Sequence, residues 1–213
     1  MNLDTGYNEE EVLNALKTIV DNYNKLYDVL SVEVQNKFVN ELANMWACNY
    51  AVEFFTNDFK PTFDELLNSI NLTFENIVES ISSAATAWAL TSGGTFAKSG
   101  ITLKTNKIDV SVVKENIGGV RGINTNAQTI SARLQTITSD AESCLTGTIN
   151  AVENSGFIGG NMQENLVSSI TQIKTQLTTA ITDINNNIHE YVSKTAAEYE
   201  ELASSTARAF SGE

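Results

Sequence analysis

Long apolar stripes with almost no proline constrain this chain more than any other feature of its sequence. The chain has 213 residues and a single proline, Pro61. Along most of its length large apolar residues recur three or four positions apart, which is the period of one face of an α-helix. Because proline breaks helices and is nearly absent here, the sequence predicts an all-α protein.

Four segments carry such a stripe. The first two consist of Val12, Leu16, Ile19, Tyr23, Leu26, Leu30, Val34, Phe38, Leu42 and Met45, and of Phe63, Leu66, Ile70, Phe74, Ile77, Ile81, Ala85 and Trp88. The third and fourth consist of Val113, Ile117, Val120, Asn124, Ala127, Ile130, Leu134, Ile137, Ala141, Cys144, Thr148 and Val152, and of Leu166, Ile170, Ile173, Leu177, Ile181, Ile184, Ile188, Tyr191, Thr195, Tyr199 and Leu202.

The ends of these helices have recognisable signals. Asn8 followed by three glutamates is a good amino-terminal cap for the first helix. Pro61 is expected in the first turn of the second helix, or at a kink in a longer helix that begins near Asn49. The third and fourth helices are expected to run about 45 residues each, with three glycines between 118 and 122 weakening the start of the third. A glycine-rich break at 156–160 separates the two.

These signals predict two long antiparallel helical hairpins in tandem, arranged like a four-helix bundle. The first hairpin spans 1–92 with its turn near Trp46. A connector follows at 93–107. The second hairpin spans 108–213 with its turn near Phe157 and Gly159. The sequence leaves open whether the hairpins pair with each other or lie end to end, each with a partner chain.

The charge of the chain argues against some partners. It has 13 basic and 26 acidic residues, a net charge of −13, and a pI near 4.4. Nucleic acids and anionic membrane surfaces both require basic patches, so neither is expected as a partner. The connector holds Lys98, Lys104 and Lys107 and no acidic residue. It is an ordinary linker, or its lysines lie against the acidic helices.

The sequence offers no catalytic or metal-binding constellation, so we expect neither an enzyme nor a cofactor, and no small-molecule substrate. His189 is the only histidine, and it has no cysteines or paired carboxylates at ligand spacing. Cys48 and Cys144 are far apart, and a buried thiol is expected for each. A single disulfide remains possible if the fold brings the two together.

The amino terminus lacks the basic and apolar regions of a secretory signal peptide, and no segment has the roughly 20 apolar residues of a membrane span. We therefore expect a cytoplasmic protein, or one exported without such a leader.

The two hairpin turns share a pattern. Trp46-Ala47-Cys48 and Phe157-Ile158-Gly159 each place a large aromatic residue at the end of one helix and a small residue two positions later. The aromatic residue closes the end of the hairpin and buries a large area. The small residue is expected to let the chain reverse, which glycine does best because it accepts a positive φ.

This pattern resembles the Trp-x-Gly (WXG, ESAT-like) family of secreted, virulence-associated helical hairpins, the substrates of type VII secretion in Gram-positive bacteria and mycobacteria. The chain is similar to a tandem pair of them, with Trp46 and Phe157 at the aromatic position and Cys48 and Gly159 at the glycine position. Neither turn has both Trp and Gly. The family's carboxy-terminal export signal, Tyr-x-x-x-Asp/Glu, is missing, since Thr195 follows Tyr191 and Ala203 follows Tyr199 at that spacing.

The resemblance implies a non-enzymatic secretion substrate, or a secretion-associated adaptor, that acts through protein–protein interaction on its helical faces. Its partner would be another protein, the secretion machinery or a second copy in a homodimer. Two other classes stay open: an α-helical toxin or pore-forming component, and a coiled-coil structural or scaffold protein.

Overall fold

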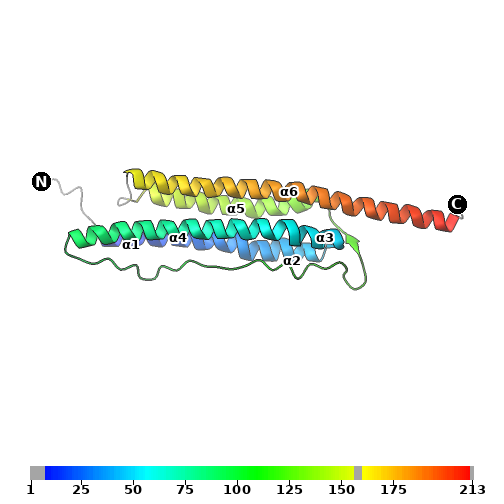
Figure 1. The fold of residues 1–213 in the computed structure, drawn as a ribbon, viewed down its shortest axis with the longest axis horizontal. Coiled ribbons are helices and arrows are strands. Elements are labelled where there is room, and N and C mark those ends of the chain that lie inside the picture. Colours follow the sequence, from blue (N-terminus) through cyan, green and yellow to red (C-terminus); the bar gives the residue numbers. More distant parts are fainter. Residues whose placement is uncertain (1–7, 156–159, 212–213) are drawn as a thin grey trace. The chain divides into compact units, whose positions relative to one another are not determined.

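The computed structural model describes residues 8–155 and 160–211, and most of these residues are helical, which confirms the all-α class (Figure 1). The elements are α1 (Glu9–Asp28), η1 (Val29–Val39), α2 (Asn40–Ala43), β1 (Trp46–Ala47), α3 (Asn49–Glu53), η2 (Phe54–Phe59), α4 (Lys60–Thr91), β2 (Gly122–Ile123), α5 (Ala127–Glu153) and α6 (Gly160–Ser211), where η marks π-helical turns.

The first helical run consists of α1, η1 and α2 without a break. Its predicted cap is present, because the side-chain oxygen of Asn8 accepts hydrogen bonds from the backbone N–H groups of Glu10 at 3.1 Å and Glu11 at 3.4 Å. Every residue of the predicted stripe is buried except Met45, which is half-buried.

The π-helical turns of η1 have a cause in the sequence. From Leu26 to Leu42 the stripe residues are all four apart. In an α-helix a step of four residues exceeds one full turn by about 40°. Four such steps would therefore carry the stripe about 160° around the helix, away from the core. A π-helix has more residues in each turn. Its geometry keeps Leu30, Val34 and Phe38 in the core, where none is more than 1% exposed.

The second run consists of α3, η2 and α4 and begins at Asn49. This start agrees with the predicted alternative of a longer helix that begins near Asn49 and contains Pro61. Pro61 is the second residue of α4, two positions after the π-helical turns of η2 end at Phe59. Proline cannot donate a backbone hydrogen bond, and here the helical run is irregular in the turn before it. The predicted stripe is buried from Phe63 to Ala85, but Trp88 is 49% exposed and Ala89 is buried in its place.

The third helix is shorter than predicted. It begins at Ala127, not near Val113, and α5 has 27 residues against 52 in α6. The expectation of two helices of about 45 residues is therefore wrong. Glycine is the reason, because Gly118, Gly119 and Gly122 all have positive φ values of 58°, 84° and 148°, a conformation that no α-helix contains.

The predicted stripe of α5 and α6 lies in the core over most of its length. Leu145 is buried where Cys144 was expected, and Cys144 is half-buried. Upstream of α5, Ile117 and Val120 are exposed, and so is Asn124. At the other end Leu202 is 51% exposed, so the buried stripe of α6 stops before it.

Residues 92–126 connect α4 to α5 and contain no helix among them. Buried hydroxyl groups of α1 hold the first part of this segment in place. The Tyr23 hydroxyl donates to the carbonyl oxygen of Lys104 at 2.6 Å, and the Tyr27 hydroxyl donates to that of Asn106 at 2.8 Å. The side chain of Asn24 bonds the carbonyl of Thr102 and the N–H of Lys104. The segment is thus extended, and it is tied to α1.

Two of the three connector lysines lie against acidic residues of the helices. Lys98 pairs with Glu79 of α4 at 2.9 Å, and Lys104 pairs with Asp28 of α1 at 2.5 Å. These pairs are exposed and contribute little energy each. They nevertheless agree with the predicted alternative in which connector lysines lie against acidic helices, here α1 and α4 of the first hairpin.

The described residues group into two compact units. Unit 1 contains 8–30, 66–106, 139–155 and 160–177, and unit 2 contains 31–65, 107–138 and 178–211. Each unit therefore contains segments of both hairpins.

The two hairpins contact each other within each unit. In unit 1 the Ser69 hydroxyl of α4 donates to the side-chain oxygen of Gln176 of α6 at 2.8 Å. In unit 2 Arg133 of α5 forms an ion pair with Glu41 of α2, and the Asn187 amide of α6 donates to Asp58 of η2 at 3.3 Å. The hairpins therefore pair with each other, and the end-to-end alternative is wrong.

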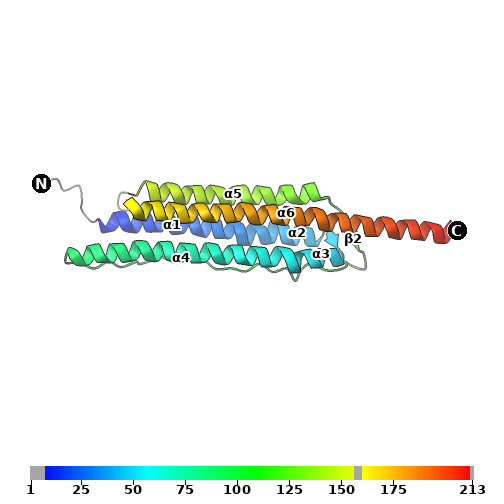
Figure 2. The same cartoon turned by 45° about the horizontal axis from the view of Figure 1, so that its top comes forward.

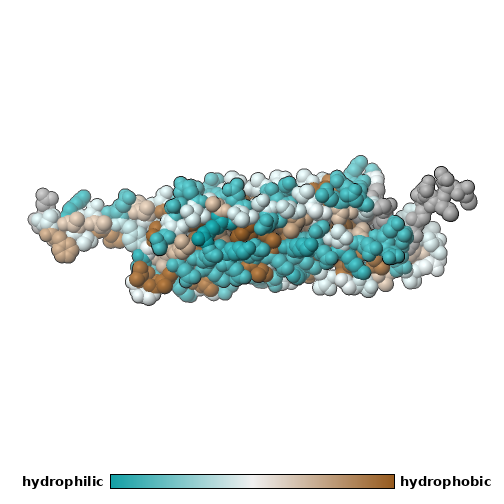
Figure 3. Space-filling view, turned by 180° about the vertical axis from the view of Figure 1, so that it is seen from behind, coloured by the Kyte–Doolittle hydropathy of each residue, from teal (hydrophilic) through white to brown (hydrophobic). Residues whose placement is uncertain are grey.

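The surface is mostly polar, and teal and white side chains dominate the face drawn in Figure 3. Much of this surface is Ser, Thr, Asn and Gln on the outer sides of α5 and α6. No helix among the described residues is long and apolar enough to cross a membrane.

The Tyr23 hydroxyl gives a first test of the connecting segment. In Tyr23→Phe the carbonyl of Lys104 and the side chain of Asn71 both lose their bond to this hydroxyl. The segment should then open more often, so trypsin should cleave at Lys98, Lys104 or Lys107 several-fold faster. Tyr50→Phe, which changes a tyrosine of unit 2, is the matched control and should digest like the wild type. Equal digestion of all three proteins would contradict the role given to Tyr23.

Candidate functional site at the tip of the first hairpin

The predicted turn at Trp46 lies in unit 2, between the end of α2 and the start of α3. The last turn of α2 closes with hydrogen bonds from Asn44 to Glu41 at 3.2 Å and from Met45 to Leu42 at 2.9 Å. Two extended residues follow, and then Cys48 precedes the first turn of α3, where its carbonyl accepts from the N–H of Ala51 at 3.1 Å. The reversal thus falls where the sequence placed it.

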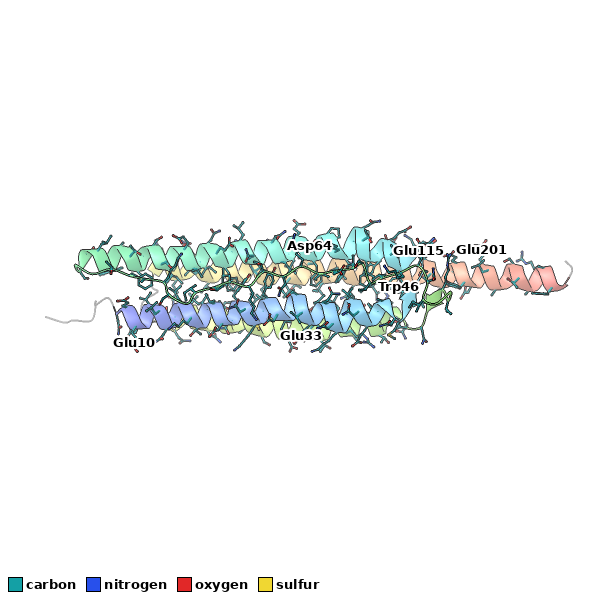
Figure 4. The ribbon with its side chains drawn as sticks, turned by 90° about the horizontal axis from the view of Figure 1, so that it is seen from below. Glu10, Glu33, Trp46, Asp64, Glu115 and Glu201 are labelled. Carbon is teal, nitrogen blue, oxygen red and sulfur yellow. The ribbon has the colours of Figure 1, made fainter. Side chains whose placement is uncertain are left out.

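Trp46 is fully buried at this tip (Figure 4). Its indole N–H donates to the hydroxyl of Thr195 of α6 at 3.2 Å. The Thr195 hydroxyl in turn donates to the carbonyl of Tyr191 at 2.8 Å. Buried tryptophan needs such a partner for its N–H. The aromatic residue therefore closes the first hairpin, as predicted, and also joins it to the last helix.

The backbone of Cys48 shows that the turn does not need a small residue in order to reverse the chain. Its φ and ψ are −168° and 175°, which is extended backbone that any residue adopts. No described residue other than glycine has a positive φ. The turn therefore needs no glycine, and cysteine at this position causes no backbone strain. What limits the side chain is space, because Cys48 is buried with its sulfur 3.6 Å from the Thr195 hydroxyl.

A short antiparallel ladder fixes the tip from another side. Trp46 of β1 pairs with Ile123 of β2, and Ala47 pairs with Gly122. Next to this ladder the N–H of Asn124 donates to the carbonyl of Met45 at 2.7 Å. The segment that precedes α5 is thereby held against the tip of the first hairpin.

Aromatic rings fill the space below the turn. We call Trp46, Phe54, Phe55, Phe59 and Tyr191 the tip cluster. Trp46 stacks on Phe54 with centroids 5.6 Å apart, Phe54 meets Tyr191 at 5.8 Å, and Phe55 meets Phe59 edge to face at 5.3 Å. Such pairs add to the stabilisation that burial alone gives. The cluster thus combines residues of both hairpins.

The electrostatics of the site keep its tyrosines neutral. Burial, followed by the hydrogen bond to Asp58 and the charges of nearby carboxylates, raises the pKa of Tyr191 to about 12. Burial likewise raises the pKa of Tyr199, one turn beyond Thr195. Both shifts favour the neutral phenol, which suits packed, hydrogen-bonded rings.

The other predicted turn residues, Phe157 and Gly159, lie outside the described residues. On either side of them α5 ends at Glu153 and α6 begins at Gly160. The Gln163 amide of α6 donates to the carbonyl of Glu153 at 3.0 Å. The ends of these two helices are thus close together.

The described residues bring no metal-binding group together: among them no three His, Cys, Asp or Glu side chains lie close enough to hold an ion. His189 is exposed on α6.

Sequence reasoning missed Thr195, Tyr191 and the Ile123–Asn124 segment as members of the site. A signal existed for Thr195, which is a polar residue within the apolar stripe of the fourth helix. In the structure it is fully buried and bonded to Trp46. For Ile123 and Asn124 the two-residue ladder is too short to leave a pattern.

The comparisons with known proteins are negative: no protein-family model matches the chain, and no curated protein and no solved structure is significantly similar to it.

The bond between Trp46 and Thr195 can be tested by substitution. Thr195→Val keeps the size of the side chain but leaves the buried indole N–H without an acceptor, which should cost about 1–3 kcal/mol of unfolding free energy. Thr195→Ser retains the hydroxyl and should cost less than half as much. Urea unfolding followed by circular dichroism measures both. If the two variants are equally stable, the hydrogen bond does not hold the tip.

Cys48 allows a second test. Since its backbone is extended, Cys48→Gly gains no relief of strain and loses a buried side chain, so it should destabilise the protein by about 1–2 kcal/mol. Cys48→Ala keeps the β-carbon and should cost less. A Cys48→Gly variant more stable than wild type would show that the turn does favour glycine.

Proposed function

We propose that this chain is a non-enzymatic protein of a type VII-like secretion system, which is either exported itself or escorts a partner protein. The observation that carries the proposal is the aromatic corner between two long helices, with Trp46 buried and Cys48 two positions later. It corresponds to the position of the Trp-x-Gly turn in the family that the sequence resembles. The matching second corner, Phe157 to Gly159, supports the proposal from the sequence.

The pairing of the two hairpins also supports it. Members of that family assemble four-helix bundles from two chains. Here Trp46 reaches Thr195 across the hairpins, and Arg133 reaches Glu41. One chain thus supplies the helices that two family members would supply together. Linking the halves replaces association between chains by pairing at high effective concentration.

The proposed activity is protein–protein interaction on helical faces. A chain with net charge −13 and outer faces of uncharged polar residues remains soluble while presenting broad helical surfaces. Such surfaces suit contact with a secretion apparatus or with a cargo protein.

Export from a Gram-positive host tests the proposal. The chain would be produced in a strain with an intact type VII system and in the same strain without its membrane-bound secretion ATPase. The proposal predicts that the protein, or a companion protein encoded beside it, reaches the culture medium only when the ATPase is present. A cytoplasmic marker enzyme controls for lysis.

Equal amounts of both proteins outside the two strains, or retention of both in the two strains, would contradict the proposal. Leakage of dye from liposomes on addition of the purified protein would favour the pore-forming class instead.

A further inference from the structure

Part of the connecting segment lies on unit 1 as an extended chain. We call residues 101–106 the strap; in Figures 1 and 2 it belongs to the thin green line that runs beside α1 and α4. None of its side chains is buried: Ile101 and Leu103 are half-buried, and the other residues are exposed. Because little apolar surface is removed from water here, hydrogen bonds to α1 contribute much of what holds the strap.

The uncharged side chains of α1 bond only main-chain atoms of the strap. The hydroxyls of Tyr23 and Tyr27 each donate to a strap carbonyl. The side-chain amide of Asn24 donates to another carbonyl at 3.1 Å and accepts from a backbone N–H at 3.0 Å. Since these contacts use no strap side chain, they are available to extended chains of other sequences. The contacted residues alternate, as those on one edge of a β-strand do: Thr102, Lys104 and Asn106.

The spacing of the two tyrosines matches the repeat of an extended chain. Tyr23 and Tyr27 are about one helical turn apart, which is about 6 Å along α1. Their acceptors, the carbonyls of Lys104 and Asn106, are two residues apart, which is about 6.6 Å along an extended chain. The strap therefore runs in the same direction as α1 and in step with it.

The Tyr23 hydroxyl keeps a partner when the strap leaves. It lies 2.6 Å from the carbonyl oxygen of Lys104 and 2.7 Å from the side-chain oxygen of Asn71 on α4. A hydroxyl has one hydrogen, so the two acceptors compete for it. Opening the strap leaves Asn71 as the acceptor and avoids an unpaired buried donor at Tyr23, which would be costly. The strap can therefore open locally without loss of the helical core beneath it.

The charge around the strap favours a basic occupant. Lys104 pairs with Asp28 of α1 at 2.5 Å. Acidic residues outnumber basic ones on both α1 and α4. A lysine at the same place in an incoming chain would meet Asp28 in the same way, whereas a carboxylate there would be repelled.

We propose that Tyr23, Asn24 and Tyr27 form a binding site for extended polypeptide, which the strap occupies as an internal ligand. The external ligand is an unfolded segment of another protein with a lysine at the place of Lys104, and it binds when the strap opens. Main-chain hydrogen bonds give the affinity, as they do when a peptide is added to the edge of a sheet. The site belongs to unit 1, and its existence does not depend on export of this chain.

The strap regulates the site by competition. It belongs to the same chain, so its effective concentration at the site is about a millimolar or more. The intact protein therefore binds external segments weakly, and any change that opens the strap should increase its affinity for them.

Fluorescence anisotropy with a labelled peptide of residues 99–108 tests the proposal on the full chain. Lys104→Pro removes the N–H that bonds Asn24 and the pair with Asp28, so it opens the strap without altering α1. This variant should bind the peptide about tenfold more tightly than the wild type, because the internal competitor is weakened. Lys107→Pro is the matched control and should bind like the wild type, because neither the backbone N–H nor the side chain of Lys107 has a bonding partner among the described residues.

Two further arms distinguish a binding site from a simple tether. Adding Asn24→Ala to Lys104→Pro should remove most of the gain in affinity. A second peptide, in which every residue except the lysine of position 104 is replaced by another uncharged residue, should bind the Lys104→Pro variant within about threefold of the first, since recognition is through the main chain.

Circular dichroism establishes that each variant is folded. If Lys104→Pro does not fold, Lys104→Glu takes its place, because repulsion from Asp28 also opens the strap. A folded variant that binds no more peptide than the wild type, or a gain in affinity that Asn24→Ala leaves unchanged, overturns the proposal. Binding of the strap sequence but not of the second peptide also overturns it, because α1 would then recognise this one segment alone.

Discussion

The burial of Trp46 against Thr195 is the contact on which unit 2 depends most. An indole ring buried without a partner for its N–H would be costly, and here that partner comes from the last helix of the second hairpin. The backbone beside the ring pairs with Ile123, and the ring itself stacks on Phe54. One side chain thus ties together a turn, a loop and two helices that are distant in sequence.

This contact helps to explain why segments of the two hairpins form one compact unit in this region. The tip cluster draws its rings from both hairpins, and Arg133 pairs with Glu41 close by. Unit 1 has its own links, through Ser69 and Gln176 and through the tyrosine hydroxyls that bind the connecting segment. The buried hydrogen bond between Trp46 and Thr195 favours one arrangement in unit 2, whereas apolar packing alone tolerates several.

Much of the fold could be predicted from the sequence because helical periodicity is a strong signal. The stripes from Val12 to Leu42 and from Phe63 to Ala85 are buried as predicted. The third helix was extended too far because Val113, Ile117 and Val120 keep the helical period by coincidence, while three glycines adopt positive φ. Trp46 and Cys48 lie at the turn of the first hairpin, but the conformational reason given for Cys48 was wrong. Thr195 was conspicuous as a polar residue within an apolar stripe, but its pairing with Trp46 could not be identified, because pairing between distant helices leaves no local pattern.

Tryptophan fluorescence tests the central claim most directly. The chain has two tryptophans, of which Trp46 is buried and Trp88 is half-exposed, so the Trp88→Phe variant reports on Trp46 alone. Because the partner of Trp46 belongs to the same chain, its emission should be blue-shifted and resistant to acrylamide at every protein concentration, including those at which the protein is monomeric. Emission typical of exposed tryptophan, or burial that appears only as concentration rises, would contradict the account.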